Sequence, residues 1–580
     1  MECSRNCKGA SPYSYHTFLF PFRWEHNEGK HDMDLFYECL QDGKWACSKD
    51  DPSLVRYIAQ NYRFRLSDTD LDDNQRILLA YNEYKYFHAS ARIAIYGEGD
   101  GKEIVHNYLR RFESGCDSHI LIKKDNKDNK ENIEYLLHVN SINLKVYNTG
   151  VAILLFQAEY YGDKMVNNEV KRTPNFDDVL AINQYGRRVC PPFISLEAGD
   201  SCPELADRLT LVIDGKEICE DFKVVVSNPE QHLNYISKIV METLGGNFSF
   251  QKQRNSSKAL RKRTFFGRFC HARKRGEGEK TIYIEPIIDD RMFVISVVRD
   301  NQLAETMREW LASENRYFYE DDVFAENSLK LYQFMFVDTK SPSCADRIMR
   351  RDLIKRHCYS RWVEEGTLYG ITHQGFVCIT KQDDDFSKNV ITAHMLTLYT
   401  QMLMLVLAQR VFFVQFNNET SNISHNLLET TGEDFNVFKY NVDDLISLQE
   451  RYNSFKARIM NFEVTAQEQG IEMYKMMQQA LYISEEAAEL DAQLNLVQNT
   501  VNTIMERRRE IQMAVLTALG TLAAAVGIDQ ILLVLAFSVF MLAVTWLSFR
   551  GKQKLLIFIV LVVIVGLATA VKFGLLGFYG

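Results

Sequence analysis

Charged residues are nearly absent from one end of this sequence, although they are common elsewhere. The chain has 580 residues, of which 25% are charged and 46% apolar, and these are ordinary values for globular proteins. Residues 511–549, however, contain a single charged side chain, that of Asp529. The composition therefore argues against general disorder and confines any membrane chemistry to the C-terminal end.

Several features that would define a function class are also missing. Residues 1–24 lack a basic segment followed by an apolar core, so we expect no cleaved signal and a cytosolic N-terminal part. The twelve cysteines form no paired CxxC spacing, and a net charge of −9 gives no support for nucleic acid as a partner. Catalytic patterns such as HExxH and GxSxG are absent, and residues 96–103 lack the first glycine and the Ser/Thr of a phosphate loop. We therefore expect that the protein is not an enzyme.

Short strand-like and helix-like runs alternate through residues 1–430, which predicts an α+β cytosolic domain. The clearest predicted elements are strands at 133–139, 143–147 and 151–158, a hairpin turn at 148–150, and helices within 73–95 and 393–411. Ten basic residues fall within residues 251–275, which indicates either a solvated loop or an electropositive surface. This shift in composition suggests a division of the domain near residue 250.

From Leu445 onward, apolar and small residues recur at alternating steps of three and four. One register lasts for about 60 residues, which predicts a single stalk helix over residues 440–510, roughly 90 Å long. Its most regular stretch consists of Leu490, Leu494, Val497, Val501 and Ile504. Because a helix with this seam is not stable alone in water, it must pack on copies of itself or on the N-terminal domain. We favour a coiled coil in a homo-oligomer.

Residues 511–580 predict a C-terminal α-helical transmembrane domain in the lipid bilayer, since a span needs about 20 apolar residues. With two spans, residues 531–549 and 555–573 cross the membrane, and with three spans residues 511–528 cross as well. Three spans keep both basic clusters, residues 507–509 and 550–554, on the cytosolic side. The expected location is the inner (cell) membrane, multi-pass, with a cytoplasmic N-terminal domain.

Asp529 is the one ionisable residue inside the longest apolar stretch. It either faces water at the outer mouth of a three-span domain or lines an ion path. In a ring of subunits, a ring of Asp529 carboxylates would favour cations.

The layout of a mixed cytosolic domain, a long stalk and short C-terminal membrane helices resembles the CorA-like divalent-metal transporter superfamily. Residues 505–527, which run from Met-Glu-Arg-Arg-Arg-Glu into an apolar helix and Gly-Ile, resemble the family's junction between stalk and first span. The segments 183–188 (Asn-Gln-Tyr-Gly-Arg-Arg), 191–192 (Pro-Pro) and 361–372 are similar to those of its large-domain bacterial branch. The Gly-Met-Asn motif of magnesium transporters does not occur in the chain, so magnesium selectivity is not implied.

CorA-like proteins without that motif occur as membrane effectors of type III CRISPR systems. The resemblance therefore implies an oligomeric channel or effector in antiviral defence that perturbs the membrane or the ion balance. Its small nucleotide ligand would be a messenger in which S-adenosylmethionine is joined to AMP. Two alternatives remain open: a constitutive divalent metal-ion transporter, and a membrane-anchored sensor or scaffold without a pore.

For messenger binding, we select positions where arginine forks could hold phosphate and aromatic faces could hold adenine. These positions are Tyr185, Arg187, Arg188, Tyr369 and His373. The competing interpretation of each is a structural ion pair or a core aromatic. Beyond this nucleotide and a transported divalent cation, we expect no cofactor.

Overall fold

A computed structural model describes most of the chain before residue 526. The described residues are 11–26, 31–40, 44–51, 53–65, 72–98, 104–113, 117–126, 131–188, 205–227, 236–250, 281–288, 291–312, 322–338, 342–429, 435–460 and 463–525. Two compact units are present. The first, here called the sheet unit, comprises Met1–Asn426 and Asp443–Ala492, and the second, the helical unit, comprises Leu427–Val442 and Gln493–Gly580.

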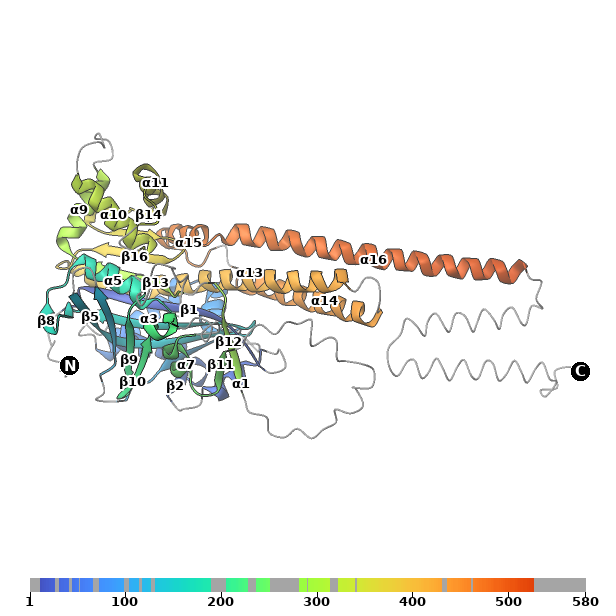
Figure 1. Cartoon of the computed structure of the whole chain (residues 1–580), viewed down its shortest axis with the longest axis horizontal. Coiled ribbons are helices and arrows are strands. Elements are labelled where there is room, and N and C mark those ends of the chain that lie inside the picture. The colour runs from blue at the N-terminus through green and yellow to red at the C-terminus, as the bar shows by residue number, and fades with distance from the viewer. Residues whose placement is uncertain are drawn as a thin grey trace, which may run out of the picture. The chain divides into compact units, whose positions relative to one another are not determined.

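The described strands of the sheet unit form one sheet of 16 strands (Figure 1). They are β1 (Ser14–His26), β2 (Trp45–Cys47), β3 (Val105–Arg110), β4 (His119–Asn126), β5 (Glu131–Tyr147), β6 (Val151–Tyr160), β7 (Asp163–Val166), β8 (Glu169–Arg172), β9 (Arg208–Ile213), β10 (Lys216–Asp221), β11 (Phe248–Phe250), β12 (Ile282–Pro286), β13 (Phe293–Arg299), β14 (Cys358–Tyr359), β15 (Leu368–Ile371) and β16 (Gly375–Thr380). The main path runs β10-β9-β4-β5-β6-β1-β13-β16-β15-β14. The α+β prediction for this part of the chain is confirmed.

The predicted hairpin is the β5–β6 hairpin, and its turn at 148–150 is confirmed. The two strands predicted at 133–139 and 143–147 are one long strand, because a bulge between Val139 and Ser141 shifts the register without ending the pairing. Gly150 closes the turn at φ +91°, and a Cβ there would lie 2.3 Å from Nε2 of His31. Only glycine fits both this backbone conformation and this packing.

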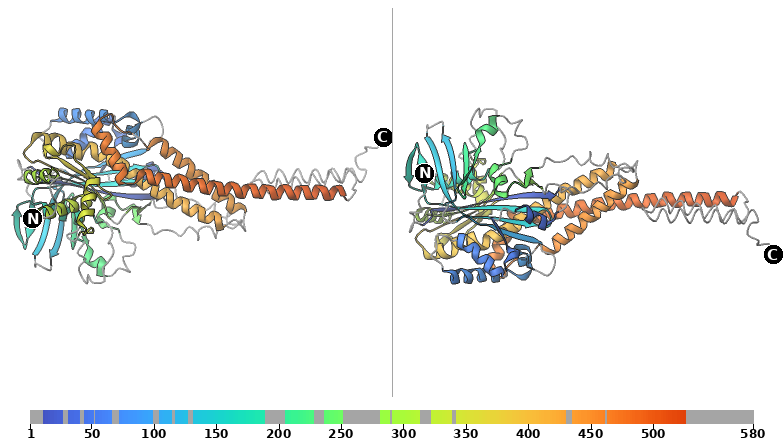
Figure 2. Two further views of the ribbon diagram at one scale, coloured as in Figure 1. Left: turned by 90° about the horizontal axis from the view of Figure 1, so that it is seen from above. Right: turned by 90° about the horizontal axis from the view of Figure 1, so that it is seen from below.

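Strand β1 lies in the middle of the sheet, between β6 and β13. Nearly all its residues are buried, which is expected where helices cover both faces of a sheet. Figure 2 shows the helices of residues 54–96 (blue) and of residues 222–244 (green) on opposite sides of the sheet. On β1, Phe18, Phe20, Phe22 and Trp24 all belong to the main hydrophobic core.

The domain is not divided near residue 250. Strand β11 ends at Phe250 and pairs in parallel with β12, which begins at Ile282, and β12 pairs with β1 in the same sheet. Strands on both sides of the basic stretch thus share one core. Residues 251–275 themselves lie outside the described residues.

The helices before residue 397 surround this sheet. They are α1 (Met33–Cys39), α2 (Leu54–Arg65), α3 (Asp73–Tyr86), α4 (Ala89–Tyr96), α5 (Phe176–Gly186), α6 (Phe222–Ser227), α7 (Lys238–Leu244), α9 (Asn301–Ala312), α10 (Asp322–Phe336), α11 (Arg347–His357) and α12 (Ala393–Leu396), with short turns η1 (Ser48–Asp50), η4 (Val363–Glu365) and η5 (Ser387–Thr392). Helix α3 begins with a capping box in which Asp72 and Gln75 satisfy each other's backbone N–H groups. The helix predicted within 73–95 is divided between α3 and α4.

Among the described residues, one helical stretch, Ser387–Leu427, is long and apolar enough to cross a membrane. It contains η5, α12 and most of α13 (Leu398–Glu429). Because 89% of its apolar window is buried inside the protein, we assign it to the core. The helix predicted within 393–411 belongs to this stretch.

The prediction of one unbroken stalk helix over residues 440–510 is wrong. Three helices occupy this segment: α14 (Phe435–Arg458), α15 (Glu468–Ala480) and α16 (Ile483–Ala525). Residues 459–467 are not helical in their described part, and Tyr482 adopts a left-handed conformation at φ +55° between α15 and α16. A positive φ at a residue other than glycine interrupts a right-handed helix.

The seam instead packs against the protein's own helices. Phe455 of α14 lies 4.5 Å from Phe412 of α13, measured between ring centroids. Asp491 of α16 accepts a hydrogen bond from Tyr452 at 2.9 Å and pairs with Lys456 at 2.7 Å. α13, α14 and the start of α16 therefore lie side by side in the sheet unit. A heptad pattern fits such a bundle as well as it fits a coiled coil between subunits.

The predicted seam residues are largely buried within a single chain. Leu490 is buried in the sheet unit, Leu494, Val497 and Val501 are buried in the helical unit, and Ile504 is half-buried. These contacts need no second copy, so the seam does not by itself support a homo-oligomer. Residues 526–580, with Asp529 and the segments predicted to span at 531–549 and 555–573, lie outside the described residues.

Candidate functional site

A cationic pocket lies in the sheet unit, where six segments of the chain meet. Its polar lining comes from Arg187, Arg291, His373, Gln374 and Arg410, and Leu481 contributes to its apolar part. We call these six residues the cationic pocket.

Arg187 enters the pocket from the C-terminal end of α5. This helix starts with a capping box between Asn175 and Asp178 and ends at Gly186. A Cβ on Gly186 would lie 2.6 Å from the ring of Phe18, so only glycine lets α5 pack this closely on β1. The close packing of α5 places Arg187, which is 2% exposed, next to the start of β13.

Uncharged oxygens orient the guanidinium of Arg187. It donates to Oε1 of Gln374 at 2.7 Å, to Oε1 of Gln184 at 2.9 Å and to the carbonyl oxygen of Val337 at 2.6 Å. These bonds hold the side chain in one orientation. Such a group suits an anionic ligand.

Backbone pairing brings a second arginine beside it. Arg188 and Arg291 form an antiparallel bridge, and the N–H of Met292 donates to the carbonyl oxygen of Arg187 at 2.7 Å. This short pairing fixes residues 187–188 against the start of β13. It places Arg291 in the same pocket as Arg187.

Arg410 contributes the third guanidinium from α13. It donates to the carbonyl oxygen of Leu481 at 2.7 Å, in the turn directly before α16. Burial lowers the pKa of Arg410, whereas the nearby Glu486 and Tyr482 act in the opposite direction. The side chain therefore links the pocket to the first turn of α16.

His373 belongs to the turn between β15 and β16. Its ring lies 6.1 Å from the ring of Tyr482, which is the residue with φ +55° before α16. Tyr482 is 52% exposed, so its ring is accessible next to the pocket. The pocket thus has an aromatic neighbour on the turn that Arg410 holds.

The described lining of the cationic pocket contains no Asp or Glu. Three guanidinium groups and a histidine converge there, and Glu486 approaches Arg410 from α16. Arginine forks match the oxygens of phosphate in charge and in geometry. The arrangement therefore has the chemistry to accept a phosphorylated anion.

Two of the five predicted ligand residues, Arg187 and His373, meet in this pocket, and Arg188 supports it through its backbone. Tyr185 lies elsewhere, with the ammonium of Lys124 5.4 Å from its ring centroid. Tyr369 is fully buried, packs on Tyr359, Phe376 and Tyr399, and does not line the cationic pocket.

Arg291 and Arg410 line the pocket but were not among the ligand residues predicted from the sequence. Neither residue belongs to a local motif, and only the pairing of residues 187–188 with β13 and the packing of α13 bring them to Arg187. A long apolar helix with one arginine in its middle was the available signal for Arg410.

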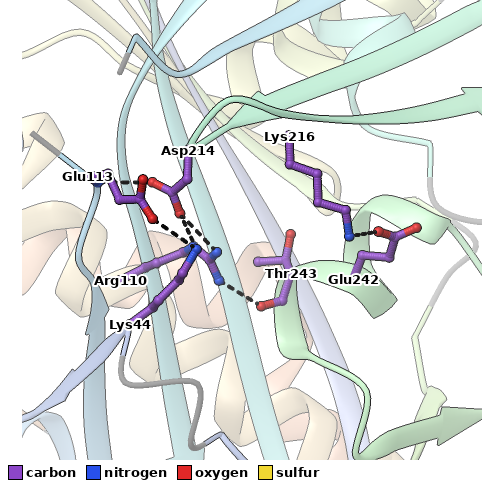
Figure 3. A network of polar contacts seen from close by, with 7 residues as sticks. All are labelled: Lys44, Arg110, Glu113, Asp214, Lys216, Glu242 and Thr243. Atoms are coloured by element: carbon purple, nitrogen blue, oxygen red, sulfur yellow. Dashed lines mark hydrogen bonds and ion pairs between the residues drawn. The ribbon is translucent and has the colours of Figure 1, made fainter. Parts of the chain in front are cut away.

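A second charged cluster lies at an edge of the sheet (Figure 3). Asp214, in the β9–β10 turn, pairs with Lys44 at 3.0 Å and Arg110 at 3.4 Å and accepts the N–H of Glu113 at 3.0 Å. Burial acts to raise the pKa of Asp214, but the Glu113 N–H and the two cations outweigh it and lower that pKa. Because these charges satisfy one another, we assign the cluster to holding the turn.

No group of three or more His, Cys, Asp or Glu side chains that could hold a metal ion occurs among the described residues. Asp529, the predicted ion-binding residue, is outside them. Comparison of the chain with protein-family profiles, with characterised proteins and with solved structures finds no match.

Proposed function

We propose that this protein is a ligand-gated membrane effector, in which a nucleotide messenger binds the cationic pocket and acts on the apolar C-terminal part through α16. The observation that carries the proposal is the bond between Arg410, which lines the pocket, and Leu481, directly before α16. The helix then continues without a break to Ala525. The site of binding and the start of the transmitting element therefore share one residue contact.

The ligand class follows from the chemistry of the pocket. The guanidinium groups of Arg187, Arg291 and Arg410 favour a phosphorylated molecule, and the exposed ring of Tyr482 offers a face for a base. A small adenylate messenger satisfies both requirements. The resemblance to CorA-like effectors suggests the conjugate of S-adenosylmethionine with AMP and a role in antiviral type III CRISPR defence.

Transmission would begin at the α15–α16 turn. A phosphoryl group that recruits the Arg410 guanidinium competes with the carbonyl oxygen of Leu481 for its N–H donors. Tyr482 already holds an unfavourable backbone conformation at φ +55°, so the turn has an alternative of lower local energy. A ligand that binds one arrangement of this turn better than the other shifts the population of the two.

The membrane part of the proposal rests on composition. Residues 511–580 are almost entirely apolar and long enough for two or three spans, with basic residues at 507–509 to mark the cytosolic side. We propose that several copies assemble in the inner membrane and that Asp529 lies at or near an ion path. The absence of Gly-Met-Asn leaves the transported ion open, and the messenger opens or distorts this region.

Flux from liposomes that contain the purified full-length protein tests the proposal. Dye and ion release should rise when the S-adenosylmethionine–AMP conjugate is added and stay at the baseline with S-adenosylmethionine alone. Arg410→Gln should weaken the apparent affinity about 10–100-fold, since charged hydrogen bonds contribute about 1.5–3 kcal/mol. Arg308→Gln, which alters an exposed arginine paired with Glu305 on α9, serves as the matched control and should leave the release unchanged.

The other outcomes distinguish the rival functions. Flux of divalent cations without any ligand would indicate a constitutive transporter. No flux under either condition, with correctly folded protein in the bilayer, would indicate an anchored sensor or scaffold. Either result would overturn the proposal of a gated effector.

A further inference from the structure

A second pocket is buried between the sheet and the helices of residues 54–96, within the sheet unit. Its walls are strands β3, β5 and β6 and helices α2, α3, α4 and α13. The lining is unusually polar for a site in the core. Its polar side chains include Asn61, Glu83, Asn107, Asn143, Lys145 and Gln401. We call this site the buried polar pocket.

Hydrogen-bond donors of this pocket already have partners. Lys145, which is 4% exposed, donates to the carbonyl oxygen of Ile95 at 2.6 Å and to Oε1 of Gln401 at 3.1 Å. The side-chain amide of Asn107 donates to the same carbonyl oxygen at 3.3 Å. These bonds fix the donors against the wall of the pocket.

Two buried acceptors, in contrast, lack a donor among the described residues. Glu83 is 2% exposed, and its Oε1 accepts the Tyr96 hydroxyl at 2.5 Å while its Oε2 has no hydrogen-bond partner. Asn61 is 8% exposed, and its Oδ1 also has none. A buried acceptor without a donor costs about 1–3 kcal/mol, so two such atoms in one pocket call for an occupant.

We propose that the buried polar pocket binds a small molecule with a primary ammonium group on an apolar body. The ammonium would donate to Oε2 of Glu83 and Oδ1 of Asn61, the two acceptors that are open. Around them stand the rings of Tyr57, Tyr96 and Tyr108, whose faces attract cations. The apolar remainder would pack on the aliphatic part of the lining, which includes Leu144 and Met404.

This ligand differs in chemistry from the one proposed for the cationic pocket. The two sites share no lining residue, and one offers open acceptors where the other offers guanidinium donors. Both, however, contain residues of α13: Gln401 and Met404 in the buried polar pocket, and Leu407 and Arg410 in the cationic one. The inference does not rest on the proposed function and can be tested without any measurement of flux.

Calorimetric titration of the full-length protein in detergent tests this inference, with propylammonium as the probe and 1-propanol as its neutral match. We expect saturable binding of propylammonium in the millimolar range and binding of 1-propanol at least about tenfold weaker. Glu83→Gln keeps the acceptor for Tyr96 but removes the charge, and it should weaken propylammonium binding about tenfold or more. Glu220→Gln is the control, because Glu220 is also buried but lies outside the pocket and accepts the N–H of Lys238.

Should Glu83→Gln fail to fold, Asn61→Leu removes the other open acceptor and should also weaken binding of the ammonium. Equal binding of 1-propanol, or unchanged binding by both folded variants, would overturn the proposal. So would the absence of saturable binding of propylammonium to the unaltered protein, since the pocket would then hold only water.

Discussion

The two halves of α16 have the same helical backbone but opposite surroundings. In the first half, residues 483–501, several apolar side chains are buried within the chain: Ile483, Leu490, Leu494, Val497 and Val501. In the second half, residues 502–525, most of the described side chains are exposed, among them Glu506, Arg507, Arg509, Gln512 and Met513. The first half is therefore a packed element of the protein, and the second half has its side chains available to lipid or to another copy.

The heptad pattern predicted one role for the whole helix, whereas the different surroundings indicate a separate role for each half of α16. In the proposed function, the packed half, which follows the Arg410–Leu481 contact, would respond to the ligand. The exposed half, which leads into the apolar residues, would deliver that response. Self-association, if it uses α16, must use the exposed half, because the seam residues of the packed half are already occupied.

The largest contrast should come from placing a charge in each half. Leu490→Asp buries an unpaired carboxylate at a site that is 0% exposed, and it should lower the free energy of unfolding by about 3–5 kcal/mol. Met513→Asp, at a site that is 62% exposed, should change this free energy by less than about 0.5 kcal/mol. Urea unfolding followed by tryptophan fluorescence measures both. Equal effects of the two variants would contradict the division of α16 into a packed and an exposed half.

Acid should act on the sheet unit through its buried histidines. Burial lowers the pKa of His16 to about 4, against an ordinary value near 6.5, although a hydrogen bond with Asn183 acts in the opposite direction. The unfolded chain therefore binds a proton that the folded chain excludes, so stability is full above pH 6.5 and falls between pH 6.5 and 4. The loss from this residue is about 3 kcal/mol.

Unfolding free energies measured across pH 4–8 test this slope, and His16→Gln should flatten it. His31, whose pKa burial also lowers to about 4, should account for much of the remaining slope. If the unfolding free energy of His16→Gln depended on pH as that of the unaltered protein does, protonation of His16 would not destabilise the folded state.

Gly470→Ala tests how tightly α15 packs on the sheet unit next to the packed half. Helix propensity favours alanine by about 1 kcal/mol. A Cβ at this position, however, would lie 2.2 Å from the hydroxyl of Tyr86 and 2.5 Å from Cγ2 of Thr465. Overpacking costs about 1–3 kcal/mol, which exceeds this gain at most values, so we expect a net loss of up to about 2 kcal/mol.

Tyr86→Phe supplies the matched background for this substitution, because it removes the nearest atom of the clash. The loss caused by Gly470→Ala should be smaller in that background, as measured by urea unfolding of the four proteins in a double-mutant cycle. A stabilising effect of Gly470→Ala alone would show that α15 can move away from Tyr86.

The smallest effect should come from the bond that ties α14 to the packed half. Tyr452→Phe removes the hydrogen bond to Asp491, while Lys456 still pairs with that carboxylate. We expect a loss of about 1 kcal/mol in unfolding free energy. The same substitution in an Asp491→Ala background, which has no acceptor, should cost less, and an equal cost in both backgrounds would mean that the bond contributes nothing.

Local patterns in the sequence predicted local structure well. The β5–β6 hairpin, the helix starting at Asp73 and the apolar helix after residue 393 all follow from nearest-neighbour signals such as turn residues, caps and periodicity. The stalk failed because the spacing of Leu445, Tyr452, Leu490 and Val501 shows which faces are apolar and not what covers them. Non-helical residues at 459–460, 463–467 and 481–482 leave that spacing unchanged. They divide the expected single helix into α14, α15 and α16.

For the same reason, the sequence predicted only some residues of the candidate site. Arg187 was selected with Arg188 beside Tyr185, and His373 beside Tyr369, but the meeting of Arg187 with His373 depends on the order of β13, β16 and β15 in the sheet. Arg410 needed the packing of α13 against the α15–α16 turn. Tyr369 stands near a histidine in the sequence, which is compatible with a ligand site. In the structure, three aromatic side chains pack around it.

The central claim is that a ligand in the cationic pocket changes the start of α16, and hydrogen exchange of the full-length protein measures this most directly. Addition of the S-adenosylmethionine–AMP conjugate should change the exchange of the amides of residues 477–490, and Arg410→Gln should abolish that change while Arg308→Gln preserves it. Ligand-dependent flux without any change in exchange at these amides would contradict the account.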